Sequence, residues 1–150
     1  MSPPAPPTPP PPSVVLDLEW EGDLRFRASA GAASLVLDSQ GAAGPTPVQA
    51  LAFGLAGCMA VDVVHILRKG RLEPKAVHAR LEAERNPVDP KRLVSVRLHF
   101  VVQGEVPDEK VARAIALSRD TYCSVWHSLR PDIDFRTSFE VARPARRPPA

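Results

Sequence analysis

The sequence predicts an α+β domain, and two patterns carry that prediction. Several short segments alternate apolar and polar residues, which is typical of strands, whereas one long run of small and aliphatic residues is typical of a helix. In chain order the expected elements are βββ-α-ββ-α-β, and such runs of strands broken by helices are typical of the α+β class. We therefore expect antiparallel sheets around two long helices.

Three short strands are expected before the long helix, over residues 14–20, 24–28 and 35–37. Residues 14–20 alternate apolar Val and Leu with Asp17 and Glu19 and end in Trp20, which indicates a half-buried strand. Glu-Gly-Asp follows as a turn, so the first two strands are expected to form a hairpin.

The long helix has clear boundaries. Thr46 is suited to cap it, Pro47 fits the first helical position, and Gln49 stands where a capping box places Glu or Gln. Gly70 is expected to supply a left-handed stop after Lys69. The predicted helix therefore covers residues 46–69.

The C-terminal half predicts a strand pair, a helical region and a closing strand. Residues 77–83 and 94–102 alternate as a long antiparallel pair, and a helix with apolar residues on one face begins at Pro107-Asp108. Residues 121–129 continue as a shorter helix or a kinked extension. Residues 133–141 alternate as the last strand.

Composition narrows the function classes. The chain has 150 residues, of which 44% are hydrophobic, 24% charged and only 5% aromatic. A core built from Val, Leu, Ile and Ala buries less area per side chain, so we expect a homodimer that shares burial between two chains. The formal charge of +2 is too small to indicate a nucleic-acid partner.

The termini differ in composition from the middle. Residues 1–13 are rich in proline and are predicted to form a disordered tail, with a Pro-rich ligand for a partner domain as the alternative. Residues 143–150 are predicted to be a disordered basic tail, which leaves one domain over 14–142. The N-terminus lacks the basic and apolar regions of a secretory signal, so a cytoplasmic location is expected. The uncharged run 50–61 is too short to span a bilayer, so no membrane partner is expected.

Two cysteines stand out in a chain that otherwise avoids the residue. Cys58 lies inside the long helix, where Ala or Val would serve a purely structural role better, and Cys123 follows the second helical region. A disulfide between them in a reducing compartment would be transient, which indicates a redox couple. The alternative is an inert buried thiol in a tightly packed helix, which Gly54 and Gly57 also suit.

The residues around both cysteines resemble a known family. The stretch TPVQALAFGLAGCMAVDVVHILRKGR, a strand pair and then VARAIALSRDTYCSV are similar to the OsmC/Ohr family of osmotically induced and organic hydroperoxide resistance proteins. The resemblance covers about residues 14–142. It implies an OsmC-like fold and an intertwined homodimer with paired sites at the interface. It also implies that Cys58 attacks a hydroperoxide, that Cys123 resolves the product as a disulfide, and that an external dithiol reduces it without a cofactor.

The activation of the attacking thiol is where the sequence departs from the family. In the family an arginine from the N-terminal strands lies against the first cysteine, held by a glutamate in the first turn of the cysteine helix. Arg25 and Arg27 are the candidate arginines and share one face of a strand. Val48 and Gln49 stand where the glutamate would be, so the arginine is expected to lack its carboxylate partner.

Other side chains near the thiols set further expectations. Apolar residues favour organic hydroperoxides as substrates: Leu51, Phe53, Leu55 and Trp126. Asp62 and His65 share the helix face of Cys58, where they either tune its ionisation or face solvent or a subunit interface. Cys123, near a helix start, is better placed than Cys58 for help from a helix dipole. The other histidines lack zinc-ligand spacing, so no metal is expected.

A second class of function stays open at this point. A non-enzymatic module of the same fold would bind an apolar small molecule at the dimer cleft, with thiols that are incidental or sensing. The missing glutamate favours that alternative, and the second cysteine favours the peroxidase.

Overall fold

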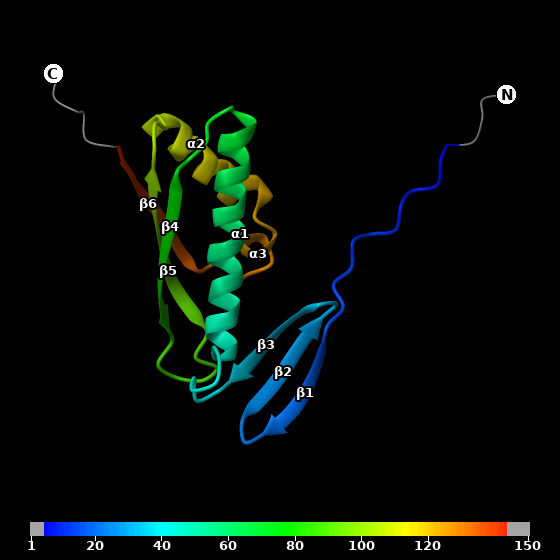
Figure 1. Ribbon diagram of the computed structural model, residues 1–150. Coiled ribbons are helices and arrows are strands. Elements are labelled where there is room, and N and C mark those ends of the chain that lie inside the picture. Colours follow the sequence, from blue (N-terminus) through cyan, green and yellow to red (C-terminus); the bar gives the residue numbers. More distant parts are fainter. Residues whose placement is uncertain (1–4, 144–150) are drawn as a thin grey trace. The chain divides into compact units, whose positions relative to one another are not determined.

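The computed structural model describes residues 5–143, coloured along the chain in Figure 1. It divides into two compact units, one up to Ala50 and one from Leu51 onward. Residues 5–16 form neither helix nor strand. Residues 1–4 and 144–150 of the two predicted tails lie outside the described part of the chain, so disorder of the tails stays a prediction.

The first unit holds a three-stranded antiparallel sheet in the order β1-β2-β3. Its strands are β1 (Asp17–Gly22), β2 (Arg25–Ala30) and β3 (Ala33–Asp38), which confirms the three strands and the hairpin. The expected burial is wrong, because Leu18 is 51% and Trp20 67% exposed in the single chain. One three-stranded sheet has no second layer of its own to cover an apolar face.

The helix α1 (Pro47–Lys69) has the predicted start. The Thr46 N–H donates to Gln49 Oε1 at 2.9 Å, and the Gln49 N–H donates to Thr46 Oγ1 at 3.2 Å, which confirms the capping box. Leu55, Met59, Val63 and Leu67 recur every four residues along the helix and are all buried. They form the side of α1 that faces the core of the second unit.

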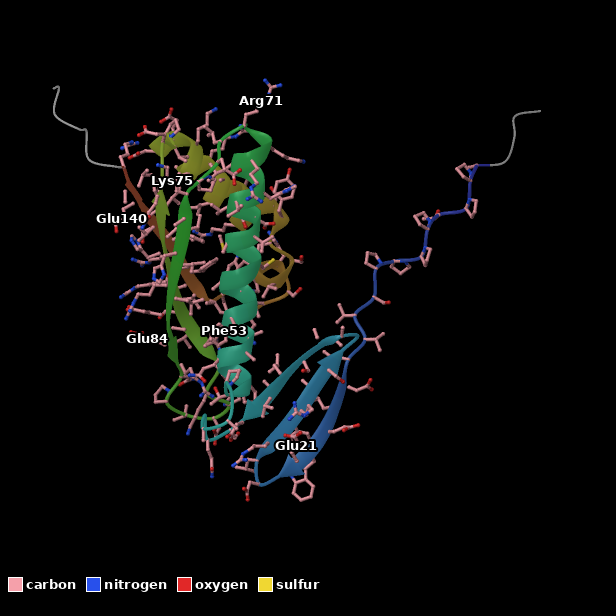
Figure 2. The ribbon with its side chains drawn as sticks, viewed as in Figure 1. Glu21, Phe53, Arg71, Lys75, Glu84 and Glu140 are labelled. Atoms are coloured by element: carbon pink, nitrogen blue, oxygen red, sulfur yellow. The ribbon has the colours of Figure 1, made fainter. Side chains whose placement is uncertain are left out.

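The end of α1 corrects the role expected for Gly70. The left-handed residue is Arg71, with φ of 59°, while the Arg71 and Leu72 N–H groups donate to the Arg68 and Leu67 carbonyls at 2.9 Å each. This is a Schellman motif with its left-handed position one residue later than predicted. Gly70 has little room for a side chain, because a Cβ there would lie 3.3 Å from the Leu67 carbonyl oxygen. Figure 2 labels Arg71 at this end of the helix.

Replacing Arg71 by glycine is expected to stabilise the protein. A side chain in the left-handed region is strained, and glycine removes that strain, so the free energy of unfolding in urea should rise by about 0.5–1 kcal/mol. Arg71→Ala is the matched control, because it removes the guanidinium but keeps the Cβ and the strain. Equal stability changes in the two variants would contradict the backbone explanation.

The second unit holds a sheet in the order β4-β5-β6. The strands β4 (Ala76–Arg85) and β5 (Leu93–Gln103) form the predicted antiparallel pair, but β6 (Asp134–Ala142) pairs with β5 in parallel. The expectation of purely antiparallel sheets is therefore wrong. The chain between β5 and β6 crosses over through helical segments and re-enters the sheet in the same direction.

The crossover contains a shorter second helix than expected. It consists of α2 (Asp108–Leu117, 10 residues), the π-helical turn η1 (Ser118–Tyr122) and α3 (Ser124–His127, 4 residues). Only α1 is long, so the expectation of two long helices is wrong. Of the two alternatives for residues 121–129, the separate shorter helix is confirmed, because Cys123 is extended and α3 begins after it. Two sheets with helices still make an α+β fold. π-turns inside helices occur often at functional sites.

One side of α1 is apolar and uncovered in the single chain. Leu51, Phe53 and Val61 are 43%, 69% and 68% exposed, and a Cβ at Gly54 or Gly57 would meet no atom within 4 Å. By length and composition alone α1 would also be able to cross a membrane, and 22% of its most apolar window is buried. Exposed apolar surface of this kind is typical of an interaction site.

Candidate active site

The second unit brings the two cysteines together. Cys58 lies half-buried on α1, Cys123 is fully buried between η1 and α3, and both are free thiols. Cys58 is near enough to Cys123 to raise the pKa of the Cys123 thiol, so the two thiols are neighbours. They come from segments 65 residues apart, since 123 − 58 = 65.

The surroundings of Cys123 keep its thiol protonated. Burial is the main influence that raises the pKa of Cys123 to about 11, and the nearby Cys58 contributes in the same direction. Together they outweigh the Trp126 N–H, which donates to Sγ at 3.3 Å and lowers the pKa. The expected help from a helix dipole is therefore overridden. The reasons are that α3 has only four residues and that the sulfur is removed from water.

The high pKa of Cys123 can be measured directly. In a Cys58→Ser variant, the 13Cβ chemical shift of Cys123 is expected to titrate well above pH 9, since burial is the main cause of the shift and survives the substitution. In urea-unfolded protein the midpoint should fall to about 9.0, the ordinary value. A midpoint below 9 in the folded variant would contradict burial as the dominant influence.

A buried serine links α1 to the segment that carries Cys123. The Ser118 hydroxyl donates to Asp62 Oδ2 at 2.8 Å, and the Ser118 carbonyl accepts the Cys123 N–H at 2.8 Å. Asp62 is therefore held by a partner, whereas His65 is exposed. Sequence reasoning missed Ser118, although a hydroxyl at a buried position signals a hydrogen bond.

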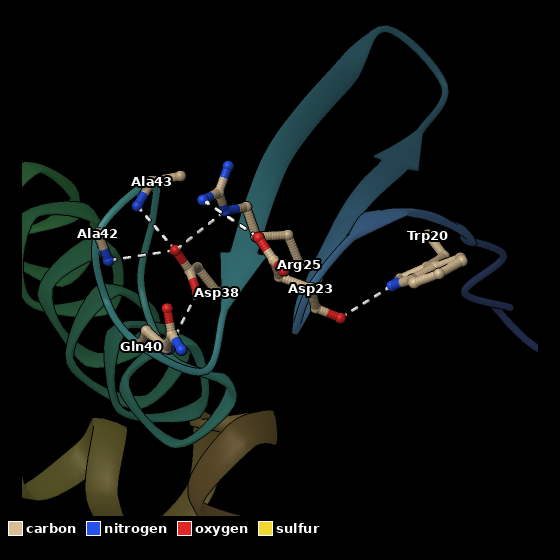
Figure 3. A network of polar contacts seen from close by, with 7 residues as sticks. All are labelled: Trp20, Asp23, Arg25, Asp38, Gln40, Ala42 and Ala43. Carbon is tan, nitrogen blue, oxygen red and sulfur yellow. Dashed lines mark hydrogen bonds and ion pairs between the residues drawn. The ribbon is translucent and has the colours of Figure 1, made fainter.

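Arg25 and Arg27 both have carboxylate partners within the first unit. Arg25 Nε lies 3.4 Å from Asp38 Oδ2, a contact that Figure 3 marks with a dashed line, and Arg27 pairs with Glu21. The expectation of an arginine without a carboxylate is therefore wrong for both. The acid for Arg25 comes from the end of β3 and the acid for Arg27 from β1, and neither comes from the first turn of α1.

Asp38 is a fixed anchor for Arg25. It is 1% exposed and accepts N–H groups of Gln40 and Ala43 at 2.9 Å and of Ala42 at 3.2 Å. The bonds from Ala43, Gln40 and Ala42, together with Arg25, hold its pKa below the ordinary value against the effect of burial. Sequence reasoning missed Asp38, although an acid before the glycine-containing stretch 39–45 signals a loop organised by a carboxylate.

The predicted apolar residues lie in different surroundings. Leu51 and Phe53 are on the exposed side of α1, while Leu55 is 1% exposed and belongs to the core. Leu55 therefore offers no surface to a substrate, because it falls on the buried side of the helix. Trp126 is half-buried and packs on Phe135, with ring centroids 4.5 Å apart.

No group of three metal-ligating side chains gathers within residues 5–143. The two neighbouring thiols are therefore the candidate reactive groups. That the protein works without a cofactor stays a prediction.

Comparison with known proteins places this site in a family. The family model described as OsmC-like protein matches residues 39–138, more than half of the chain, and includes both cysteines. This protein belongs to the OsmC-like family. Protein YhfA of Escherichia coli K12 is 35% identical to it over 127 residues, which span 83% of this chain and 95% of YhfA.

Solved structures show the same fold. A hypothetical protein from Aquifex aeolicus VF5 superposes with a TM-score of 0.83 at 26% identity, covering 89% of this OsmC-like chain and 98% of its own. An organic hydroperoxide resistance protein OsmC from Legionella pneumophila has a TM-score of 0.65 at 18% identity, over 86% of this chain and 97% of its own. The second likeness is one of fold alone.

Proposed function

We propose that this OsmC-like protein is a thiol-dependent peroxidase that reduces organic hydroperoxides through Cys58 and Cys123. The observation that carries the proposal is the neighbouring pair of free thiols, one half-buried and one fully buried with a raised pKa. Two thiols in such different surroundings are suited to different roles in the reaction. The more accessible sulfur meets the oxidant, and the buried thiol stays neutral and unreactive until its neighbour has reacted.

The proposed chemistry has three steps. The Cys58 thiolate attacks the terminal oxygen of ROOH, the O–O bond breaks, and the alkoxide takes a proton and leaves as ROH, which leaves Cys58 as a sulfenic acid. The Cys123 sulfur then attacks the Cys58 sulfur, a disulfide forms, and water leaves with the Cys123 proton. An external dithiol reduces the disulfide and is itself oxidised to a disulfide, which returns two thiols.

The apolar surroundings favour an organic peroxide. Leu51 and Phe53 on α1 and the half-buried Trp126 offer apolar area to an alkyl or aryl group. The name of the Legionella relative, an organic hydroperoxide resistance protein, agrees with that substrate class. Reduction of H2O2, which has no apolar body, is expected to be slower.

The proposed active form is an intertwined homodimer in the cytoplasm, without nucleic acid or membrane as a partner. Two apolar surfaces of the single chain support it. One is the uncovered side of α1, and the other is the β1–β3 sheet, where Leu18, Leu24, Phe26 and Leu37 line a shallow hollow of about 350 Å³. A second copy would cover both with surface of the same kind.

Arg25 is the arginine that we propose to activate Cys58 in this assembly. Its carboxylate partner Asp38 is buried and fixed by three backbone N–H groups, whereas Glu21, the partner of Arg27, is 34% exposed. A guanidinium held in place stabilises a thiolate without first losing its freedom. A loosely held guanidinium does so less well.

Arg25→Ala is therefore expected to slow peroxide reduction at pH 7 by about tenfold, the equivalent of about one unit in the pKa of a nucleophile. Arg27→Ala is the matched control and should change the rate by less than about threefold. Stopped-flow measurement of the first oxidation step checks both. A larger loss for Arg27→Ala would reverse the assignment.

The function itself is tested by counting thiols. One equivalent of cumene hydroperoxide should remove both free thiols per chain, yield cumyl alcohol, and produce a Cys58–Cys123 disulfide in peptide mapping. A dithiol should then restore both thiols and sustain turnover. Retention of both thiols after peroxide treatment would refute the peroxidase.

The alternative is a non-enzymatic module that binds an apolar small molecule at a dimer cleft. The observation in its favour is that Val48 and Gln49 replace the family's glutamate, and that the Gln49 side chain is already engaged in the capping box. Unchanged thiols together with saturable binding of cumyl alcohol would support this module.

A further inference from the structure

A pocket of about 550 Å³ lies at the C-terminal end of α1, apart from the thiols. One wall is the α1 face that carries Asp62, His65 and Lys69, at helical spacings of three and four residues. The facing wall is the α2 face with Lys110 and Arg113, three residues apart. The volume lies in the range of small-molecule sites.

The charges at this pocket are mostly positive. Lys69, Lys110 and Arg113 line it from two different helices, and Asp62 is the carboxylate among the lining residues. Within residues 5–143, no carboxylate lies within 4.0 Å of any of the three cations. Most other arginines of the described chain have such a partner, for example Arg68 with Glu73. The three cations are therefore available to an anion from solution.

Apolar side chains form the rest of the lining. Leu67, 2% exposed, and the half-buried Ile66 come from α1, Leu72 from the loop after it, and Leu117 from the end of α2. Leu67 and Leu72 occupy the two positions whose side chains meet in a Schellman motif, so the shape of this wall follows from the helix end. A simple inorganic ion would leave this apolar surface unused.

We propose that this pocket binds a small organic carboxylate with an apolar body. The carboxylate would be held by Arg113 and the two lysines, because a guanidinium matches a carboxylate with two parallel hydrogen bonds. The apolar body would lie on the leucine-rich wall. Asp62 disfavours a doubly charged ligand, since its own negative charge lies at the same pocket.

The pocket adjoins the segment that holds Cys123. Tyr122, the residue before Cys123, lines the pocket. Asp62, also in the lining, accepts a hydrogen bond from the Ser118 hydroxyl, and the Ser118 carbonyl accepts one from the Cys123 N–H. A bound carboxylate would therefore lie against η1. The binding proposal itself does not depend on peroxide chemistry.

Octanoate is the probe for the test, measured by titration calorimetry and by 1H–15N chemical shifts in the absence of peroxide. We expect saturable binding with a Kd of about 1 mM or tighter, and shift changes centred on residues 62–72 and 110–122. Acetate has the charge without the body, phosphate is a compact inorganic anion, and 1-octanol has the body without the charge. All three should bind at least about fivefold more weakly.

The variant Lys110→Gln/Arg113→Gln is expected to weaken octanoate binding at least about fivefold, and both positions are exposed, so the fold should persist. Arg97→Gln, an exposed arginine on β5, is the control and should leave the Kd unchanged. Equal binding of 1-octanol or of phosphate, shift changes centred on Leu51 and Phe53, or an unaffected double variant would each overturn the proposal.

Discussion

Replacing Cys58 by serine is expected to abolish dithiol-dependent reduction of cumene hydroperoxide, with a loss of at least about a thousandfold in rate. A serine hydroxyl is almost fully protonated at neutral pH and cannot form the sulfenic acid on which the cycle depends. The rate of peroxide loss with excess dithiol measures the effect. Because Cys58 is half-buried and small, the substitution should leave the fold intact, which circular dichroism checks.

Cys123→Ser is the matched control for that loss. It keeps the attacking sulfur, so one equivalent of peroxide should still be consumed rapidly, and a sulfenic acid trap such as dimedone should label Cys58. Repeated turnover should fall, because no second thiol condenses with the sulfenic acid. Full turnover in Cys58→Ser, or no first equivalent in Cys123→Ser, would mean that the roles of the two cysteines are reversed.

Val61→Glu is expected to separate the proposed dimer into monomers. Val61 is 68% exposed on the uncovered side of α1, so the single chain should tolerate the change. At an interface the same carboxylate would be buried without a partner, which should weaken association at least about a hundredfold. Sedimentation equilibrium at micromolar concentration measures the association.

Val88→Glu is the control, because Val88 is 64% exposed in the loop between β4 and β5 and receives the same substitution. It should remain dimeric. A monomeric wild-type protein at micromolar concentration would refute the dimer. If the wild-type protein instead sediments together with added lipid vesicles, the uncovered side of α1 is a membrane-binding surface.

Local signals predicted much of the fold. The alternation of apolar residues indicated every strand except β3, which a short apolar run indicated, and Thr46, Pro47 and Gln49 marked the start of α1 to within a residue. The same reasoning failed at Arg71. Gly70 precedes Arg71, and either residue is a candidate for the left-handed position. Which of the two adopts it depends on which N–H groups make the last hydrogen bonds of the helix.

Sequence reasoning predicted the two cysteines but missed two buried polar side chains, Asp38 in the first unit and Ser118 in the second. Asp38 escaped notice because three of its partners are backbone N–H groups, so its only signal in the sequence is its position before the glycine-containing stretch 39–45. Ser118 escaped because its partner Asp62 lies 56 residues away. The burial of Trp20 was predicted wrongly, because alternation shows that a strand has an apolar face but not what covers that face.

The sequence by itself determined the elements, their order, and the presence of one thiol in α1 and another after α2, because helix caps, turns and alternation act over a few residues. Tertiary structure alone decided that β6 runs parallel to β5, that Leu55 turns into the core, and that Cys58 and Cys123 become neighbours. It also decided that Cys123 stays protonated. The reason is physical, since burial and the proximity of distant segments arise only when the chain packs, and a pKa responds to both.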